Sequence, residues 1–369
     1  MEILATEDRE AICSTFSRLL SDLADETRLR QVIETDTGFD PELWSKMAEL
    51  GLTGILIDPE HNGIGASLVE VEALMEHAGE HLYSGPFIST CVLAPLLLSS
   101  SAEDQTAAAL LKGIAAGSTI FCVAGCGSSG DWSQNLQVNA QKSADGWFLS
   151  GTAGFVSHVA GATHCLAYAS SEEGSGVYLV DLGDSEIGVT HHDTDDRTIR
   201  LSSLSFRETR AHKLQGASEA VIQNAFHSAL VALAGDQVGA ARRIFEMTIE
   251  YLQTRYQFGQ PIGSFQALKH IAADLLIELE SASTAARQAA RSVATDSDDQ
   301  QLLSLLAGFT CADNFRKISA EAIQLHGGIA YTVEHPAHLY WRRAQTGQWL
   351  YSSSSTLKDK YLQEWEKVL

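Results

Sequence analysis

The sequence is poor in basic residues and in long apolar runs. Its 369 residues include 25 lysines and arginines against 47 aspartates and glutamates, which gives a formal net charge of −22 at pH 7. A nucleic-acid partner needs a basic face that neutralises phosphates, so this balance argues against one. No apolar run reaches the roughly 18 residues that a membrane span needs. We therefore expect neither a nucleic-acid partner nor a membrane partner.

Cysteines are also few, and they are scattered. The chain has six, and the nearest pair, Cys122 and Cys126, has no second pair that would complete a zinc site. We expect reduced, mostly buried cysteines and no metal site, as suits a reducing cytosol. The segment from Met1 to Asp8 is acidic early, unlike a secretory signal or an Arg-rich transit peptide. These features predict a cytoplasmic protein.

The chain has the composition of an ordinary globular protein, and its pattern of apolar residues changes twice along the sequence. Hydrophobic residues make up 45% and charged residues 20% of the chain, as in folded domains. Apolar residues first recur at helical spacing, then short β-rich runs alternate with glycine turns, and then the helical period returns in three long stretches. We predict an α+β, mostly α fold, with an N-terminal helical domain over residues 1–117, a middle antiparallel β-domain over 118–212 and a C-terminal helical bundle over 213–369.

The segment from Tyr251 to His270 interrupts the helical pattern with an unusual set of residues. A helix that ends near Arg255 and restarts after Pro261 would expose Arg255 beside the amides of the next helix. Arginine can bind a pyrophosphate with two hydrogen bonds, and Phe258 offers a face to a flat ring. The spacing alone is equally compatible with an ordinary helix corner that carries a surface arginine.

This segment resembles a hallmark of the acyl-CoA dehydrogenase family. Residues 321–331, followed by Glu334-His335-Pro336 and Arg342-Arg343-Ala344, resemble a second hallmark, and residues 59–65 resemble a third. The resemblance extends over essentially the whole chain, including the α, β, α order. It implies the acyl-CoA dehydrogenase fold, with a four-helix bundle at the C-terminus and FAD bound between subunits.

The resemblance also implies which residues contact FAD. One set would hold the pyrophosphate and adenosine end of an FAD seated mainly on a neighbouring subunit: Arg255, Gln257, Phe258, Gln324, Gly327 and Gly328. In the β-domain, Phe155 corresponds to an aromatic that covers the flavin, and Ser157 to a hydroxyl that reaches its reactive nitrogen. The alternative for these two is a hydrophobic strand end with a satisfied serine.

The implied reaction removes a proton next to a thioester carbonyl and transfers a hydride to the flavin, which requires a carboxylate base. Here the chain departs from the family. The usual base would follow Tyr351, where this sequence has Ser352, and the alternative position on the bundle falls near Ala229 and Leu230. Asp236 is the nearest candidate. A helical wheel places it opposite the apolar stripe of its helix, where aspartates are usually solvated or paired with an arginine.

A second departure concerns the loop from Ala124 to Asp131. Catalytic relatives have a Thr/Ser-Glu-Pro sequence there that binds the flavin, and this chain has Ala124-Gly125-Cys126. The chain therefore resembles the subunit without the base in bacterial α2β2 dehydrogenases of steroid side chains. This implies a homologous partner subunit, a bulky acyl-CoA substrate and an electron-transferring flavoprotein as acceptor. Two alternatives are a self-sufficient enzyme with Asp236 as base and a structural subunit that binds no flavin.

Overall fold

The structure is a computed structural model that describes residues 2–127, 130–132, 136–184 and 186–368. Helices come first, then strands, then helices again, so the predicted order is confirmed. Side chains set the helix starts: Asp40 accepts the N–H of Glu42, and Ser67 forms a capping box with Glu70. The N-terminal helices are α1 (Thr6–Leu23), α2 (Glu26–Val32), α3 (Pro41–Glu49), α4 (Leu68–Glu80), α5 (Ala94–Ser99) and α6 (Gln105–Ala115).

The middle of the chain forms a seven-stranded sheet in the order β1-β4-β5-β7-β3-β2, with β6 beside β7. All pairs are antiparallel except β1 with β4, which is parallel. The predicted antiparallel domain thus needs this one correction. The strands are β1 (Phe121–Ala124), β2 (Val138–Ser143), β3 (Gly146–Ser157), β4 (His164–Ala169), β5 (Gly176–Asp181), β6 (Ile187–His191) and β7 (Leu201–Lys213).

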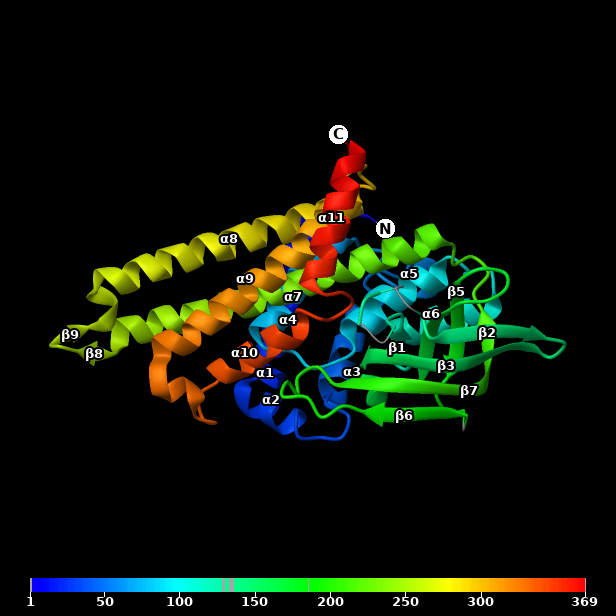
Figure 1. The fold of residues 1–369 in the computed structure, drawn as a ribbon, viewed down its shortest axis with the longest axis horizontal. Coiled ribbons are helices and arrows are strands. Elements are labelled where there is room, and N and C mark those ends of the chain that lie inside the picture. The colour runs from blue at the N-terminus through cyan, green and yellow to red at the C-terminus, as the bar shows by residue number, and fades with distance from the viewer. Residues whose placement is uncertain (1, 128–129, 133–135, 185, 369) are drawn as a thin grey trace.

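Over residues 213–368, the structure has five α-helices where the sequence predicts three long helical stretches. A polar run at residues 295–299 divides the second predicted stretch, and a non-helical segment at 348–353 divides the last one. The helices α7, α8 and α9 run side by side along the molecule, and a small hairpin lies at the end farthest from the sheet (Figure 1). These elements are α7 (Glu219–Thr254), β8 (Tyr256–Gln257), β9 (Gln260–Pro261), α8 (Gln266–Ala294), α9 (Gln300–His326), α10 (Ala337–Gly347) and α11 (Ser354–Val368).

The helix α7 is buried on every side along its middle, from Ala225 to Ala241. Glycines allow α4 to lie directly against it. A Cβ added to Gly239 would collide with the carbonyl of Glu76, and one added to Gly79 would collide with the carbonyl of Asp236. Close backbone packing of two helices requires residues without side chains at the crossing. The two helices therefore leave no space between them at this level.

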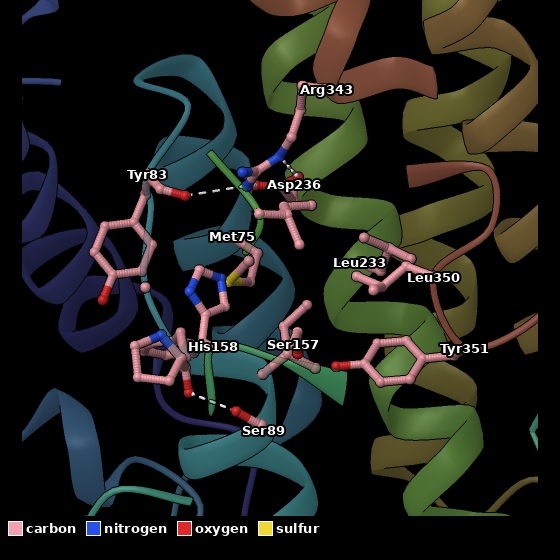
Figure 2. A pocket seen from close by; sticks show the side chains of 15 residues that line it. Met75, Tyr83, Ser89, Ser157, His158, Leu233, Asp236, Arg343, Leu350 and Tyr351 are labelled. Atoms are coloured by element: carbon pink, nitrogen blue, oxygen red, sulfur yellow. Dashed lines mark hydrogen bonds and ion pairs between the residues drawn. The ribbon is translucent and has the colours of Figure 1, made fainter. Parts of the chain in front are cut away.

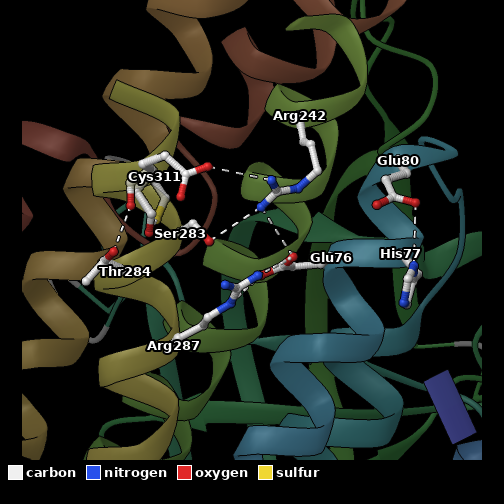
Figure 3. Close-up of polar contacts among 10 residues, drawn as sticks. Glu76, His77, Glu80, Arg242, Ser283, Thr284, Arg287 and Cys311 are labelled. Carbon is white, nitrogen blue, oxygen red and sulfur yellow. Dashed lines mark hydrogen bonds and ion pairs between the residues drawn. The ribbon is translucent and has the colours of Figure 1, made fainter. Parts of the chain in front are cut away.

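An ion-pair network fastens α8 to this helix pair (Figure 3). Glu76 of α4 lies 3.0 Å from Arg287 of α8 and 3.7 Å from Arg242 of α7. Arg242 also contacts Ser283 of α8 at 3.4 Å. Burial, and next the neighbouring Glu76, raises the pKa of Glu72 well above its usual range. The network thus joins three helices, and its arginines oppose the rise in the pKa of the neighbouring Glu72.

Candidate active site and cofactor corner

A narrow crevice lies where the three parts of the chain meet (Figure 2). Its cavity volume is about 30 Å³, roughly that of one water molecule, whereas small-molecule sites commonly measure ~300–1,000 Å³. A flavin ring or an acyl chain does not fit in this space. The polar residues that line the crevice include Tyr83, Ser157, His158, Asp236, Arg343 and Tyr351.

Arg343, on α10, is buried in this crevice and uses all five of its N–H donors. It binds Asp236 of α7 through Nη2 at 2.8 Å and Nε at 3.3 Å. Nη1 donates to the hydroxyl and carbonyl of Thr198, before β7, at 2.9 and 3.3 Å. Nη2 also donates to the carbonyl of Tyr83, after α4, at 3.1 Å. We call these four residues the clamp, because they join the N-terminal, middle and C-terminal parts.

The clamp determines what Asp236 can do. Its side chain is 2% exposed, so the wheel-based prediction of a solvated face is wrong; the wheel assumes one buried face, and α7 is buried all round. The alternative prediction, pairing with an arginine, is what the structure shows. Burial alone would lower the pKa of Arg343, but the charge of Asp236 raises it, so the guanidinium stays charged. Gly235 and Gly239 provide no room for a substrate, because the backbone of α4 occupies it.

The positions where the family carries its base have no carboxylate. Ser352 is 2% exposed, and its Oγ has no hydrogen-bond partner among the described residues. Ala229 and Leu230 lie on α7 and are buried in the hydrophobic core of the protein. Asp236 is the single carboxylate among the residues that line the crevice. A general base must reach the proton that it removes, and the carboxylate present here is bound by Arg343.

Aromatic side chains fill the end of the crevice near the sheet. The hydroxyl of Tyr351 points toward Ser157, the residue expected to reach the flavin (Figure 2). Trp132 meets the Tyr351 ring edge-on at 6.2 Å and stacks on Phe226 of α7 at 5.7 Å. The backbone N–H of Trp132 donates to the Tyr351 carbonyl at 2.7 Å. The loop after β1 is therefore folded onto the chain's own segment 351–353; residues 128 and 129 of this predicted flavin loop lie outside the described residues.

The crevice nevertheless keeps a strained backbone. Phe155, His158 and Tyr351 have φ angles of 54°, 52° and 69°, a region that residues other than glycine rarely adopt. Such strain clusters at functional sites. Phe155 is 40% exposed and lies outside the cavity. His158 is buried, and burial, followed by the charges of Arg343 and Arg200, lowers its pKa to about 3; it is therefore neutral near pH 7.

The second candidate region is the hairpin at the far end of α7. Arg255 ends that helix, and the backbone turns through Phe258 and Gly259, whose φ angles are 52° and 77°. Two positive φ angles define the tight turn that suits a two-residue hairpin. Phe258 is 92% exposed. Its side chain therefore contributes no burial energy that would offset the strain of its backbone. Among the described residues, no carboxylate forms an ion pair with Arg255.

The turn after α9 completes this region. Gly327 has a φ of 65° and ends α9, and a Cβ added to Gly327 or Gly328 would meet nothing within 4 Å. The ring of Tyr251, one turn before Arg255, stacks on His326 at 4.7 Å, which brings the two segments together. We call the residues presented there the corner; Gly327 is half-buried and the others are exposed: Arg255, Gln257, Phe258, Gln324, Gly327 and Gly328.

The corner fits the dinucleotide end of a cofactor, and the crevice does not fit its ring. The corner offers an exposed guanidinium with no ion-pair partner among the described residues, an exposed aromatic face and open backbone at two glycines. The described residues contain no group of three or more histidine, cysteine, aspartate or glutamate side chains that could hold a metal ion. In the described part of the chain, no helix is both long and apolar enough to cross a membrane.

The sequence allowed an arginine partner for Asp236 but did not indicate which arginine, and it indicated neither the Trp132 stack nor the Tyr251–His326 stack. Arg343 belongs to the second hallmark, Arg342-Arg343-Ala344. The residues next to it in the sequence do not indicate that it contacts Asp236, 107 positions away. One signal was available for the clamp: a lone aspartate in an apolar helix needs a buried partner. The two aromatic contacts join segments that are distant in sequence, so no local pattern indicates them.

Comparison with known proteins agrees with this architecture. Residues 6–118 match the family described as acyl-CoA dehydrogenase, N-terminal domain, and residues 219–353 match acyl-CoA dehydrogenase, C-terminal domain. The chain is 28% identical over 343 residues to acyl-CoA dehydrogenase IpdE2 of Mycolicibacterium smegmatis, which covers 92% of this chain and 93% of that protein. It is 27% identical over 357 residues to acyl-CoA dehydrogenase FadE27 of Mycobacterium tuberculosis, with 94% and 93% covered.

Solved structures share the whole fold. A variant of the Tcur3481-Tcur3483 steroid ACAD has a TM-score of 0.88 at 27% identity, with 96% of each chain covered. The ChsE4-ChsE5 complex from Mycobacterium tuberculosis has a TM-score of 0.88 at 24% identity, with 99% of each covered, and supports the fold. The chain therefore belongs to the acyl-CoA dehydrogenase family, and its relatives indicate an oxidoreductase that acts on acyl-CoA.

Proposed function

We propose that this chain is the subunit without the catalytic base in a heteromeric, FAD-dependent acyl-CoA dehydrogenase. Its corner completes the FAD site of a homologous partner subunit. The observation that carries the proposal is the contrast between a crevice of about 30 Å³ and a corner that is open and exposed. A chain that used its own site would need the reverse: room for its substrate and a free carboxylate beside it.

The proposed chemistry divides between the two subunits. A bound FAD would supply the hydride acceptor, and the partner would supply the carboxylate that takes the proton. Arg255 binds the pyrophosphate of that FAD as a charged fork, while Phe258 offers its face to the adenine. Gly327 and Gly328 allow backbone N–H groups to approach the phosphates. This assignment gives Phe155 and Ser157 no flavin contact on their own chain.

Two alternatives are less compatible with the geometry. An enzyme with Asp236 as base would have to break the pair with Arg343 and open the packing of α4 on α7. A structural subunit without flavin contact would have no use for the strained and 92% exposed Phe258.

The substrate class in this proposal is a bulky acyl-CoA thioester, which is too large for a crevice of about 30 Å³ and is therefore held by the partner. A relative of this chain is described as a steroid ACAD, and giving up one active site of each pair would leave volume for a polycyclic acyl group. An electron-transferring flavoprotein as acceptor and a cytoplasmic location remain predictions.

The test uses the complex of this chain with a co-expressed family member that carries a bundle glutamate. Replacing Arg255 by alanine removes charge-assisted hydrogen bonds to phosphate, worth about 1.5–3 kcal/mol, so FAD should bind roughly 10- to 100-fold more weakly. The measurement is the dissociation constant of FAD from flavin fluorescence. The thermal unfolding of the isolated chain should not change, because Arg255 is exposed.

Arg210→Ala is the matched control, since this arginine is exposed on β7, far from the corner. It should leave FAD affinity unchanged. If Arg255→Ala binds FAD as tightly as the unaltered complex does, the corner does not hold the cofactor and the proposal is wrong. A purified chain that is yellow and active without any partner would support the self-sufficient alternative.

A further inference from the structure

Three aromatic side chains contact one another in a row behind the corner, and we call this row the stack: Tyr251 and His326 have nearly parallel rings, and His335 meets His326 with ring planes 58° apart. Tyr251 of α7 lies 4.7 Å from His326, with ring planes 28° apart, and His326 lies 4.6 Å from His335. His326 is 4% exposed, and its Nδ1 lies 2.8 Å from the carbonyl of Ala322 in the preceding turn of α9. The three rings come from the end of α7, the end of α9 and the loop before α10.

Two of the three rings, those of Tyr251 and His326, are joined through the backbone to a part of the corner. The N–H of Arg255 donates to the carbonyl of Tyr251 at 2.9 Å, and the carbonyl of Arg255 accepts from Ile262 across the hairpin at 2.8 Å. His326 directly precedes Gly327. A shift of either ring therefore moves the segment that presents a cofactor contact.

We infer that the Tyr251–His326–His335 stack positions the corner for FAD. This inference rests on the function proposed above. The hairpin and the glycine turn belong to different helices, and the turn has open space at both glycines, so the spacing between Arg255 and Gly327 needs a support behind it. A stack of flat rings supplies one, because aromatic pairs have preferred separations and angles. These residues act through their neighbours and do not touch the cofactor.

Histidines in the stack give this support a dependence on pH. Burial lowers the pKa of His326, and burial followed by the nearby His326 lowers that of His335, so both rings are neutral near pH 7. Two neighbouring rings that gain protons in acid repel each other. The charged groups around them are Glu26 of α2, which favours protonation of His335, and His338 of α10, which opposes it. His338 itself faces Arg342 and Arg30.

The experiment compares His326→Ala, which removes two ring contacts, with His326→Phe, which keeps a ring. In the complex, His326→Ala should weaken FAD binding by about 10-fold, and His326→Phe should recover most of that loss. In the chain alone, hydrogen–deuterium exchange at residues 255–262 and 327–333 should be faster in the alanine variant. His192→Ala, on an exposed histidine outside the stack, should change neither measurement.

The pH profile separates positioning from simple stability. FAD affinity of the unaltered complex should fall as the pH drops below the ordinary histidine pKa of about 6.5, and the double variant His326→Phe with His335→Phe should lose that fall. Tyr251→Leu serves as a second variant if His326→Ala does not fold; it keeps apolar volume but removes a ring. If Arg255→Ala weakens FAD binding while the stack variants change neither affinity nor exchange, the stack has no positioning role. If Arg255→Ala itself has no effect, the proposed function is wrong.

Discussion

The crevice and the corner are built by the same helix and differ in almost every physical property. At its middle, α7 is buried on all sides and its aspartate is held by a buried arginine. At its end, the same helix presents an exposed arginine and an aromatic with 92% exposure. Both regions contain residues with positive φ, His158 in one and Phe258 in the other. Strain of this kind is common to functional sites, so it does not tell an open site from a closed one.

The difference lies in where the polar groups find partners. In the crevice, the five donors of Arg343 are all bound within the chain. In the corner, the glycines and Arg255 face open space. Polar groups that are hydrogen-bonded within the chain gain little from a bound ligand. Exposed hydrogen-bond donors and aromatic rings gain free energy when a ligand binds to them. The comparison favours a chain that completes another subunit's site over one that fills its own.

The largest expected effect comes from breaking the clamp. Arg343→Met leaves the carboxylate of Asp236 buried without its partner, which should cost about 3–5 kcal/mol of stability. Adding Asp236→Leu removes the stranded charge and should restore most of the loss. Thermal unfolding of the isolated chain measures both. If Arg343→Met alone is as stable as the unaltered chain, water reaches Asp236 and the crevice is not closed.

The next effect compares glycines in the two regions. Gly239→Ala adds a Cβ against the carbonyl of Glu76, where backbone would have to move, and should cost about 3 kcal/mol. Gly328→Ala adds the same group in open space and should leave the stability of the isolated chain unchanged. In the complex, Gly328→Ala should weaken FAD binding instead. Equal losses of stability in the two variants would contradict the contrast between packed and open backbone.

The sequence predicts the corner better than the crevice for a physical reason. Arg255, Gln257 and Phe258 come from one short segment, so a local pattern contains their arrangement. The order of helical and β-rich textures likewise follows from local periodicity, and the fold confirms it. The crevice depends on contacts between distant segments: Gly79 allows α4 to meet α7, and Arg343 reaches Asp236 from another helix. A helical wheel drawn for one helix contains neither contact.

The smallest of these effects tests the crevice through pH. The pKa of His158 is lowered to about 3 in the folded chain. Below about pH 6.5, His158 therefore binds a proton in the unfolded chain and stays neutral in the folded chain. The stability that this neutral ring contributes is present above pH 6.5 and is lost as the pH falls, by about 2 kcal/mol between pH 7 and pH 5. His158→Asn suits the positive φ, removes this titration and should flatten that part of the profile. His227, also buried with a pKa lowered to about 4, should maintain a residual slope in the variant. An unaltered slope in His158→Asn would mean that solvent protonates His158 in the folded chain, and hence that the crevice opens.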